Sequence, residues 1–327
     1  MDIISKESAA VKWAEKKKLS NRLARKMYAA GYVKRSDRMA HCGDVIGLKV
    51  CPDCGHAHVA SAQLCRDKLC PTCAWRLSLK RYAEMCKTFE ALDISELVPL
   101  FWTLTVRNCA PADLSQTLQD MARDWNRLMA RRKIKPLIKG WARSVEVTYN
   151  RAANTMHPHY HVIVLADKEQ LQYLCKALTD RTCLMRLSLM LKKAWQESAR
   201  LDYEPITDLR LITSKDGNDG DISAALLETY KYSVKASDLD DMPLDTFRYL
   251  VNGLAGKRMT AYGGVIKDAR KLMCLSERDE LTEADNDLES AKSLPCTRCG
   301  STDLQLHIFR WAASESQYRE VIGQMAQ

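Results

Sequence analysis

The spacing of hydrophobic residues predicts alternating strands and helices through the middle of the chain. Leu114, Leu118, Met121, Trp125 and Leu128 recur at three- and four-residue intervals, which is typical of one helix face. Stretches of β-branched and aromatic residues on either side of this helix indicate strands. The predicted order is strand, helix, strand, strand, helix, strand, over residues 100–106, 112–131, 142–149, 157–165, 168–199 and 208–213.

This βαββαβ order predicts an α+β fold of the ferredoxin- or RRM-like type, with an antiparallel sheet and helices on one face. A basic amphipathic helix is expected over 6–30, with Gly31 as its stop signal. Other predicted helices cover 75–89, 221–236 and 243–273, the last with an interruption at Gly263-Gly264.

Composition indicates an ordinary globular protein, with 46% hydrophobic and 28% charged residues among 327. The apolar runs are too short to span a bilayer, and the N-terminus lacks the long apolar core of a secretory signal. We therefore expect a cytoplasmic protein without a membrane partner. The predicted parts are a basic helix at 1–40, a cysteine-rich module with its following helix at 41–92, a central domain at 93–275, and a linker and tail at 276–327.

The net charge of +9 is unevenly distributed along the chain. Residues 1–40 carry eleven Lys or Arg against four Asp or Glu. Residues 277–289 carry seven acidic residues and one Arg, which is typical of a solvated linker. A basic bias of this kind attracts polyanions such as nucleic acid, although a solvated helix face explains the charge equally well.

Thirteen cysteines in a cytoplasmic chain indicate metal ligation rather than disulfides. The pairs Cys51-x-x-Cys54 and Cys70-x-x-Cys73 have the spacing of a structural zinc site. The pairing stays open, because other candidate ligands lie nearby and the set can hold one zinc ion or two. These additional candidates are Cys42, Cys65, His56 and His58.

A second half-site ends the chain. Cys296-x-x-Cys299 supplies two thiols, and its partners are expected to be His307, Cys274 or another molecule. An unmetallated turn is the alternative.

Three of the seven histidines fall within residues 157–161. On a strand, His159 and His161 project to the same face. Glu146 lies on the predicted hairpin partner, where a short loop would return it beside them, while His157 is a rival third ligand. A mixed nitrogen and oxygen set with open positions suits a catalytic Mn²⁺ or Mg²⁺.

The predicted helix over 221–236 offers a candidate nucleophile. Glu228 and Tyr232 are four residues apart and share a face, with Lys235 one turn further. Tyr230 points about 200° away from Tyr232 on a helix and is the less suitable candidate. A phenol can attack a metal-activated phosphodiester and become covalently joined to it.

Three ordered motifs resemble those of HUH endonucleases. They are the strand Phe101-Trp102-Thr103-Leu104-Thr105, the His159-Tyr160-His161 segment, and Glu228-x-x-Lys231-Tyr232. The sequence is most similar to replication initiators of small rolling-circle plasmids from Gram-positive bacteria. The similarity includes Cys42-Gly43, Cys65-Arg66 and the Cys70-Pro71 knuckle, and covers about 40–255.

The resemblance implies a DNA endonuclease and strand transferase that nicks the plasmid double-strand origin at a single-stranded hairpin. Tyr232 would take the 5′-phosphate and release a priming 3′-OH, with Lys231 or Lys235 steadying the charge. Glu228 would activate water at termination. Host helicase and polymerase are the partners that such an initiator implies.

Two alternatives stay open at this point. A single-strand transposase of the HUH type uses the same chemistry, and genomic context would distinguish it. A non-enzymatic zinc-finger DNA-binding regulator explains the cysteines and the charge. It leaves the histidine pair, Glu228 and Tyr232 without a role.

Overall fold

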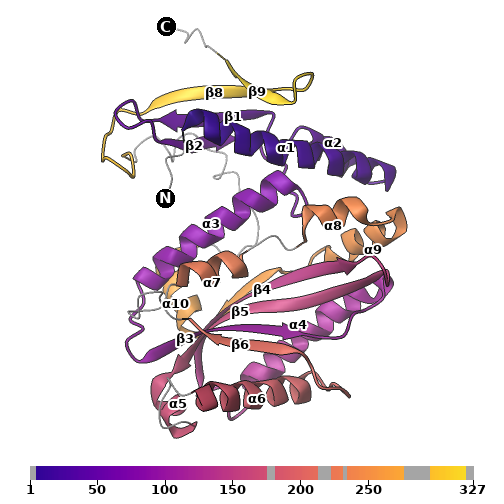
Figure 1. Cartoon of the computed structure of the whole chain (residues 1–327), viewed down its shortest axis with the longest axis vertical. Coiled ribbons are helices and arrows are strands. Elements are labelled where there is room, and N and C mark those ends of the chain that lie inside the picture. Colours follow the sequence, from indigo (N-terminus) through magenta and orange to yellow (C-terminus); the bar gives the residue numbers. More distant parts are fainter. Residues whose placement is uncertain (1–4, 175–180, 213–221, 231–233, 276–294, 322–327) are drawn as a thin grey trace. The chain divides into compact units, whose positions relative to one another are not determined.

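A computed structural model describes residues 5–174, 181–212, 222–230, 234–275 and 295–321. The chain divides into two compact units, one comprising 1–77 with 280–327 and the other 78–279. We call these unit 1 and unit 2 (Figure 1). The boundary falls within helix α3, Pro71–Glu90. Unit 1 thus draws on the predicted segments 1–40, 41–92 and 276–327, whose independence as folding parts remains a prediction.

Unit 1 begins with the basic helix that the sequence predicts. Helix α1 spans Lys6–Ala29, and the Ser5 side chain caps it by accepting a hydrogen bond from the Ser8 N–H. Gly31 follows in the left-handed region at φ 92°, which terminates the helix. Helix α2, Val33–Ala40, comes next. Trp13, Leu23 and Met27 are buried on one face of α1, while most of its basic residues are at least partly exposed.

The sheet of unit 1 joins segments from both ends of the sequence. Its strands are β1 (Val45–Val50), β2 (Ala57–Ala62), β8 (Gln305–Ala312) and β9 (Gln317–Val321). They lie in the antiparallel order β2–β1–β8–β9, so the N-terminal and C-terminal hairpins meet along β1 and β8. The sequence analysis predicted none of these strands, because they are short and lack a clear alternation.

Unit 2 is built on a second antiparallel sheet. Its strands are β3 (Leu97–Thr105), β4 (Ile138–Asn150), β5 (Thr155–Asp167), β6 (Thr207–Leu211) and β7 (Thr260–Gly263). Their order is β6–β3–β5–β4–β7, and every neighbouring pair is antiparallel. The strand–helix–strand–strand–helix–strand succession from β3 to β6 is the one that the sequence predicts. The chain is therefore of the α+β class.

The two helices of the predicted βαββαβ unit share one face of this sheet, as expected, but other helices also cover the opposite face (Figure 1). Helices α4 (Leu114–Ala130) and α6 (Arg181–Ser198) lie on one face, where Trp125 and Trp195 pack against Tyr160 of β5. On the other face, Met85 of α3 and Ile266 of α10 (Gly264–Leu272) share a core with Ile163 of β5. Alternate residues of β5 thus enter two different cores.

The C-terminal half of unit 2 confirms the interruption predicted at Gly263-Gly264. Strand β7 ends at Gly263 and separates α9 (Leu244–Leu254) from α10, so two helices with a strand between them occupy the region expected to be helical over 243–273. Gly264 has φ 57°, and a Cβ there would lie 1.9 Å from the carbonyl oxygen of Lys139. Only glycine fits this approach, so Gly264 allows the chain to leave the sheet and begin α10.

The expected helix over 221–236 is also shorter than predicted. Helix α7 spans Ile222–Thr229, and α8 spans Ala236–Asp241. Lys235 precedes α8 in an extended conformation, so one continuous helix does not connect them. The short helix α5 (Lys168–Leu174) directly follows β5. Among the described residues, no helix combines the length and hydrophobicity that crossing a membrane requires.

Candidate active site and metal centres

Two neighbouring strands of unit 2 bring together the predicted Glu146, His159 and His161. Glu146 on β4 lies directly opposite His159 on β5, and His161 is two residues further along the same face. Glu146 Oε2 is 3.0 Å from His161 Nε2 and 3.5 Å from His159 Nε2. The three candidate ligand atoms lie within 4.8 Å of one another. The group can therefore hold a metal ion.

Hydrogen bonds at the far side of each ring fix the two histidines. His159 Nδ1 lies 3.2 Å from the backbone oxygen of His157, which can only accept, so Nδ1 carries the proton. His161 Nδ1 lies 3.4 Å from the hydroxyl of Thr103, and the ring stacks against Phe101. Partners of this kind orient metal-binding histidines and leave Nε2 for the ion.

The electrostatics of the group favour a cation. Burial alone would raise the pKa of Glu146, but hydrogen bonds and charge from His159 and His161 outweigh it and lower that pKa. The carboxylate is thus ionised at neutral pH. Two imidazoles and one carboxylate leave coordination positions open, as a catalytic Mn²⁺ or Mg²⁺ site requires. His157 does not join the group; burial and repulsion by His159 lower its pKa.

The end of α7 is fastened to β4 beside this group. The Ser144 hydroxyl donates to the backbone oxygen of Thr229, the last residue of α7. Ser144 is also the register partner of His161. Further along β4, the Tyr149 N–H donates to the Asp238 carboxylate of α8 at 3.2 Å. The end of α7 and helix α8 thus contact β4 on either side of Glu146.

Of the predicted nucleophile motif, the structure describes Glu228 and Lys235. Glu228 is half-buried near the end of α7, and Lys235 is exposed. Lys231 and Tyr232 lie outside the described residues. Tyr230, the alternative nucleophile, is buried in the core with Met85 and Ile163, and burial raises the pKa of its phenol well above the ordinary value. A buried, protonated phenol is a poor nucleophile.

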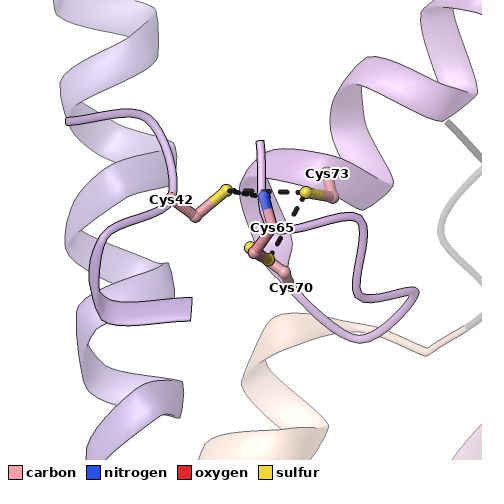
Figure 2. Close-up of side chains that lie close together, drawn as sticks. All are labelled: Cys42, Cys65, Cys70 and Cys73. Carbon is pink, nitrogen blue, oxygen red and sulfur yellow. Dashed lines mark hydrogen bonds between the residues drawn. The ribbon is translucent and has the colours of Figure 1, made fainter. Parts of the chain in front are cut away.

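Four cysteines converge in unit 1, as Figure 2 shows. They are Cys42, Cys65, Cys70 and Cys73. The sulfur of Cys73 is 3.5 Å from that of Cys42 and 3.6 Å from that of Cys65. Tetrahedral zinc, with Zn–S near 2.3 Å, requires sulfur separations of roughly 3.8 Å. The Arg66 N–H also donates to the Cys73 sulfur at 3.2 Å.

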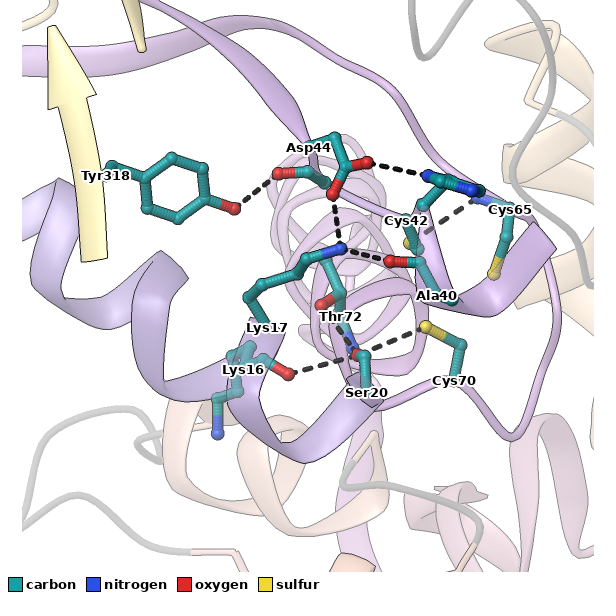
Figure 3. A network of polar contacts seen from close by, with 12 residues as sticks. Lys16, Lys17, Ser20, Ala40, Cys42, Asp44, Cys65, Cys70, Thr72 and Tyr318 are labelled. Carbon is teal, nitrogen blue, oxygen red and sulfur yellow. Dashed lines mark hydrogen bonds and ion pairs between the residues drawn. The ribbon is translucent and has the colours of Figure 1, made fainter. Parts of the chain in front are cut away.

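Helix α1 supplies polar contacts around this cluster (Figure 3). Ser20 Oγ lies 3.3 Å from the Cys70 sulfur and 2.9 Å from the Thr72 hydroxyl. Lys17, whose side chain is fully buried, donates to the backbone oxygen of Ala40 and pairs with Asp44 at 2.6 Å. The basic helix is thus part of the support of the cysteine cluster as well as a charged surface.

A second cysteine cluster joins the two ends of the chain. It consists of Cys51, Cys54, Cys296 and Cys299. The sulfurs of Cys51 and Cys299 are 3.5 Å apart, and those of Cys54 and Cys296 are 3.6 Å apart. Backbone N–H groups in the second knuckle lower the pKa of Cys296 to about 6, which favours the thiolate that a metal binds.

The predicted partners of Cys296 and Cys299 were therefore wrong. Cys51 and Cys54 fill that role, instead of His307, Cys274 or another molecule. The spacing of Cys51-x-x-Cys54 and Cys70-x-x-Cys73 suggested one shared site, but the two pairs lie in different clusters. A sequence signal was present, since both knuckles of the second cluster read Cys-x-x-Cys-Gly. Gly55 and Gly300 have φ 66° and 76°, the left-handed region that favours glycine.

Comparison with known proteins agrees with this arrangement. The sequence profile of the Rep_1 family, described as "Replication protein", matches residues 56–318. A "Protein rep" of Streptococcus pneumoniae is 34% identical over 283 residues, which cover 84% of this chain and 85% of that protein. A "Protein rep" of a Bacillus species is 30% identical over 79% of this chain and 87% of the relative.

A "Replication protein" of Staphylococcus aureus is 31% identical over 195 residues, 58% of this chain and 80% of the relative. No solved structure matches the chain. These similarities indicate that the protein is of the plasmid replication class. The chain belongs to the Rep_1 family of replication proteins, which confirms the family that its sequence motifs resemble.

Proposed function

We propose that this protein initiates rolling-circle replication by nicking one strand of a plasmid origin and becoming covalently joined to the 5′-phosphate through Tyr232. The observation that carries the proposal is the Glu146/His159/His161 group beside the anchored end of α7. The strand order β6–β3–β5–β4 supports a ferredoxin-like HUH nuclease core, because these strands in chain numbering read 4-1-3-2.

The two anchors on β4 support Tyr232 as the nucleophile. Ser144 and Tyr149 are five residues apart, which is about 17 Å along a strand, and Glu146 lies between them. Tyr232 belongs to the short segment that connects these anchors. In the sequence, Tyr232 follows the anchored end of α7 by three residues, whereas Tyr230 is committed to the core.

The proposed nicking step is a transesterification. The Tyr232 phenol gives up its proton to solvent as its oxygen attacks the scissile phosphorus. The bond to the 3′ oxygen breaks, and that oxygen takes up a proton to become the priming 3′-OH. A divalent cation at the Glu146/His159/His161 group would polarise the phosphodiester. Lys231 and Lys235 would offset the negative charge, and Lys235 is exposed where α8 begins.

Termination would use water in place of the 3′-OH. Glu228, half-buried at the end of α7, takes a proton from water as the water oxygen attacks the phosphotyrosine. The bond between phosphorus and the Tyr232 oxygen then breaks, which releases the 5′-phosphate. The origin DNA is the substrate, and host helicase and polymerase would extend the new 3′-OH.

The two cysteine clusters are proposed as structural zinc sites. Each offers four sulfurs at separations that suit tetrahedral zinc, with no position left for a substrate. Neither alternative function gains a specific observation. Membership of a family of replication proteins favours an initiator over a transposase, and a non-enzymatic regulator leaves Glu146, His159 and His161 unexplained.

The decisive experiment is detection of a protein–DNA adduct. The protein is incubated with Mn²⁺ and a labelled library of single-stranded hairpins, and adducts that survive denaturation are separated on a gel. Tyr232→Phe should abolish the adduct while DNA binding persists, because only the phenol oxygen is lost. Tyr230→Phe is the matched control and should retain it. An adduct that depends on Tyr230 instead would overturn the assignment.

A further inference from the structure

A basic cavity opens on the face of the unit 2 sheet opposite to the metal group. It has a volume of about 790 Å³ and is bounded by α4, by β4 and the edge strand β7, and by residues 256–259. Trp141, Arg143 and Val145 of β4 form part of its wall. Glu146 projects to the other face because it is an odd number of residues from each of them. The cavity is therefore separate from the candidate active site.

Arg143 is a buried cation with unused hydrogen-bonding capacity. Its side chain is 7% exposed, and its Nε and Nη1 atoms have no hydrogen-bond partner within the part of the chain that the structure describes. The guanidinium lies 4.3 Å from the ring centre of Tyr160 and 5.4 Å from that of Trp125. The Tyr160 hydroxyl hydrogen-bonds the guanidinium, but neither it nor the aromatic rings satisfy Nε and Nη1. A buried cation with unsatisfied donors is costly, so an anion is the ligand that suits this wall.

Other residues of the cavity wall also favour an anionic ligand. Arg258 and Lys257 add positive charge, and no acidic side chain belongs to the cavity wall among the residues described. Arg123 also contributes, although Asp120 pairs with it. The cavity therefore attracts an anion, and guanidinium groups are especially suited to the oxygens of a phosphate.

An aromatic surface lies beside the cations. Trp141 is partly exposed in the cavity, and its ring packs edge-on against Trp125 at 5.0 Å. Gly263 makes room for the Trp141 ring: a Cβ there would come within 2.3 Å of it. A rigid indole beside phosphate-binding cations can stack a nucleobase. The volume also falls within the range of pockets that enclose small ligands.

We propose that this cavity binds one nucleotide of a single-stranded DNA, with its phosphate at Arg143 and Arg258 and its base against Trp141. The inference rests on the proposed function, since the strand would belong to the nicked DNA. The cavity would add a second contact to the DNA, on the face of the sheet opposite to the metal group. This contact would hold the DNA strand independently of the metal group. A free nucleotide has the same chemistry and is distinguished by experiment.

The test measures binding of the full-length protein to a fluorescent oligothymidylate as a function of salt, without divalent metal. Arg258→Ala should reduce the slope of log affinity against log salt by about 0.7, the loss of one phosphate contact to a single strand. Arg143→Gln should do the same. Arg186→Ala removes an exposed arginine of α6 outside the cavity and should leave the slope unchanged. Photocross-linking of an iododeoxyuridine oligonucleotide should label Trp141.

The outcomes separate this inference from the proposed function. Unchanged slopes in Arg258→Ala and Arg143→Gln, with adduct formation intact in the wild type, would overturn the cavity alone. A wild-type protein that neither binds the oligonucleotide nor forms an adduct would overturn both. If thymidine monophosphate binds by calorimetry and Arg143→Gln abolishes only that binding, the cavity takes a free nucleotide and the strand assignment is wrong. Because Arg258 is exposed, its variant tests the proposal even if Arg143→Gln does not fold.

Discussion

The cysteine clusters of unit 1 and the Glu146/His159/His161 group of unit 2 offer metals two different environments. Each cluster supplies four sulfurs, enough to close a tetrahedron, and their knuckles join segments as distant as Cys51 and Cys299. The Glu146 group supplies three ligands from two adjacent strands that the sheet already holds together. A metal bound in the first environment would contribute to folding, whereas a metal bound in the second would contribute to the proposed chemistry.

Removing the proposed zinc should therefore have the largest effect on the structure. Structural zinc contributes about 10–16 kcal/mol of apparent binding free energy per site. After dialysis against a strong chelator, peptides of β1, β2 and β8 should lose protection in hydrogen exchange, while β3, β4 and β5 keep theirs. Mass spectrometry of the untreated protein should find about two zinc ions, one for each cluster.

Single variants would test the two clusters separately. Cys73→Ser and Cys54→Ser should each lower the zinc content by one ion, because they belong to different clusters. Cys274→Ser is the matched control, since this exposed cysteine lies outside both clusters. If chelation lowered hydrogen-exchange protection equally in the sheets of both units, the distinction between structural cysteine clusters and an open metal site would be contradicted.

The second prediction concerns the open site. Replacing His159 and His161 with Ala should abolish nicking and calorimetric Mn²⁺ binding, because two of three ligands are lost. The cost in unfolding free energy should be a few kcal/mol at most, the usual range for buried hydrogen-bonded groups. Zinc content should stay the same. Nicking at the wild-type rate in this double variant would refute the metal assignment.

In the proposed reaction, Glu228 should affect one step only. Glu228→Ala should still nick DNA and then accumulate the covalent complex, with hydrolysis slowed by about 10²–10⁴-fold, as for loss of a general base. Glu228→Gln keeps the shape of the side chain and should behave in the same way. A time course of adduct and released strand measures both steps. Equal slowing of nicking and release would mean that Glu228 has a structural or metal-binding role instead.

The same contrast explains what the sequence could predict. Strands β3 to β6 and the Glu146/His159/His161 group follow from local alternation and from one short hairpin, so both were found. The pairing of Cys51 with Cys299 depends on contact between β1 and β8, more than 250 residues apart, and no local pattern encodes it. The buried Arg143 was missed for a related reason, because a lone arginine on a strand reads as solvent-exposed until its aromatic neighbours are known.

The smallest predicted effects are those of replacing two serines, one beside a cysteine cluster of unit 1 and one beside the Glu146/His159/His161 group of unit 2. Ser20→Ala removes the hydroxyl beside the Cys70 sulfur, and Ser144→Ala removes the hydroxyl that binds the backbone oxygen of Thr229. Each should cost about 1 kcal/mol of stability, the typical net value of one hydrogen bond. Their functional effects should differ: Ser20→Ala should weaken zinc binding by about 10–100-fold, as for loss of a group that supports a metal ligand.

Ser144→Ala should leave zinc affinity unchanged and instead slow adduct formation, because it frees the end of α7, three residues before Tyr232 in the sequence, from β4. Zinc competition with a chromophoric chelator and single-turnover nicking measure the two effects on the same preparations. If both serine variants weakened zinc binding equally, the separation between a closed structural environment and an open catalytic one would fail. Thermal melts check that each variant remains folded, so that slower nicking by Ser144→Ala reports the lost contact between β4 and the end of α7 rather than loss of the sheet.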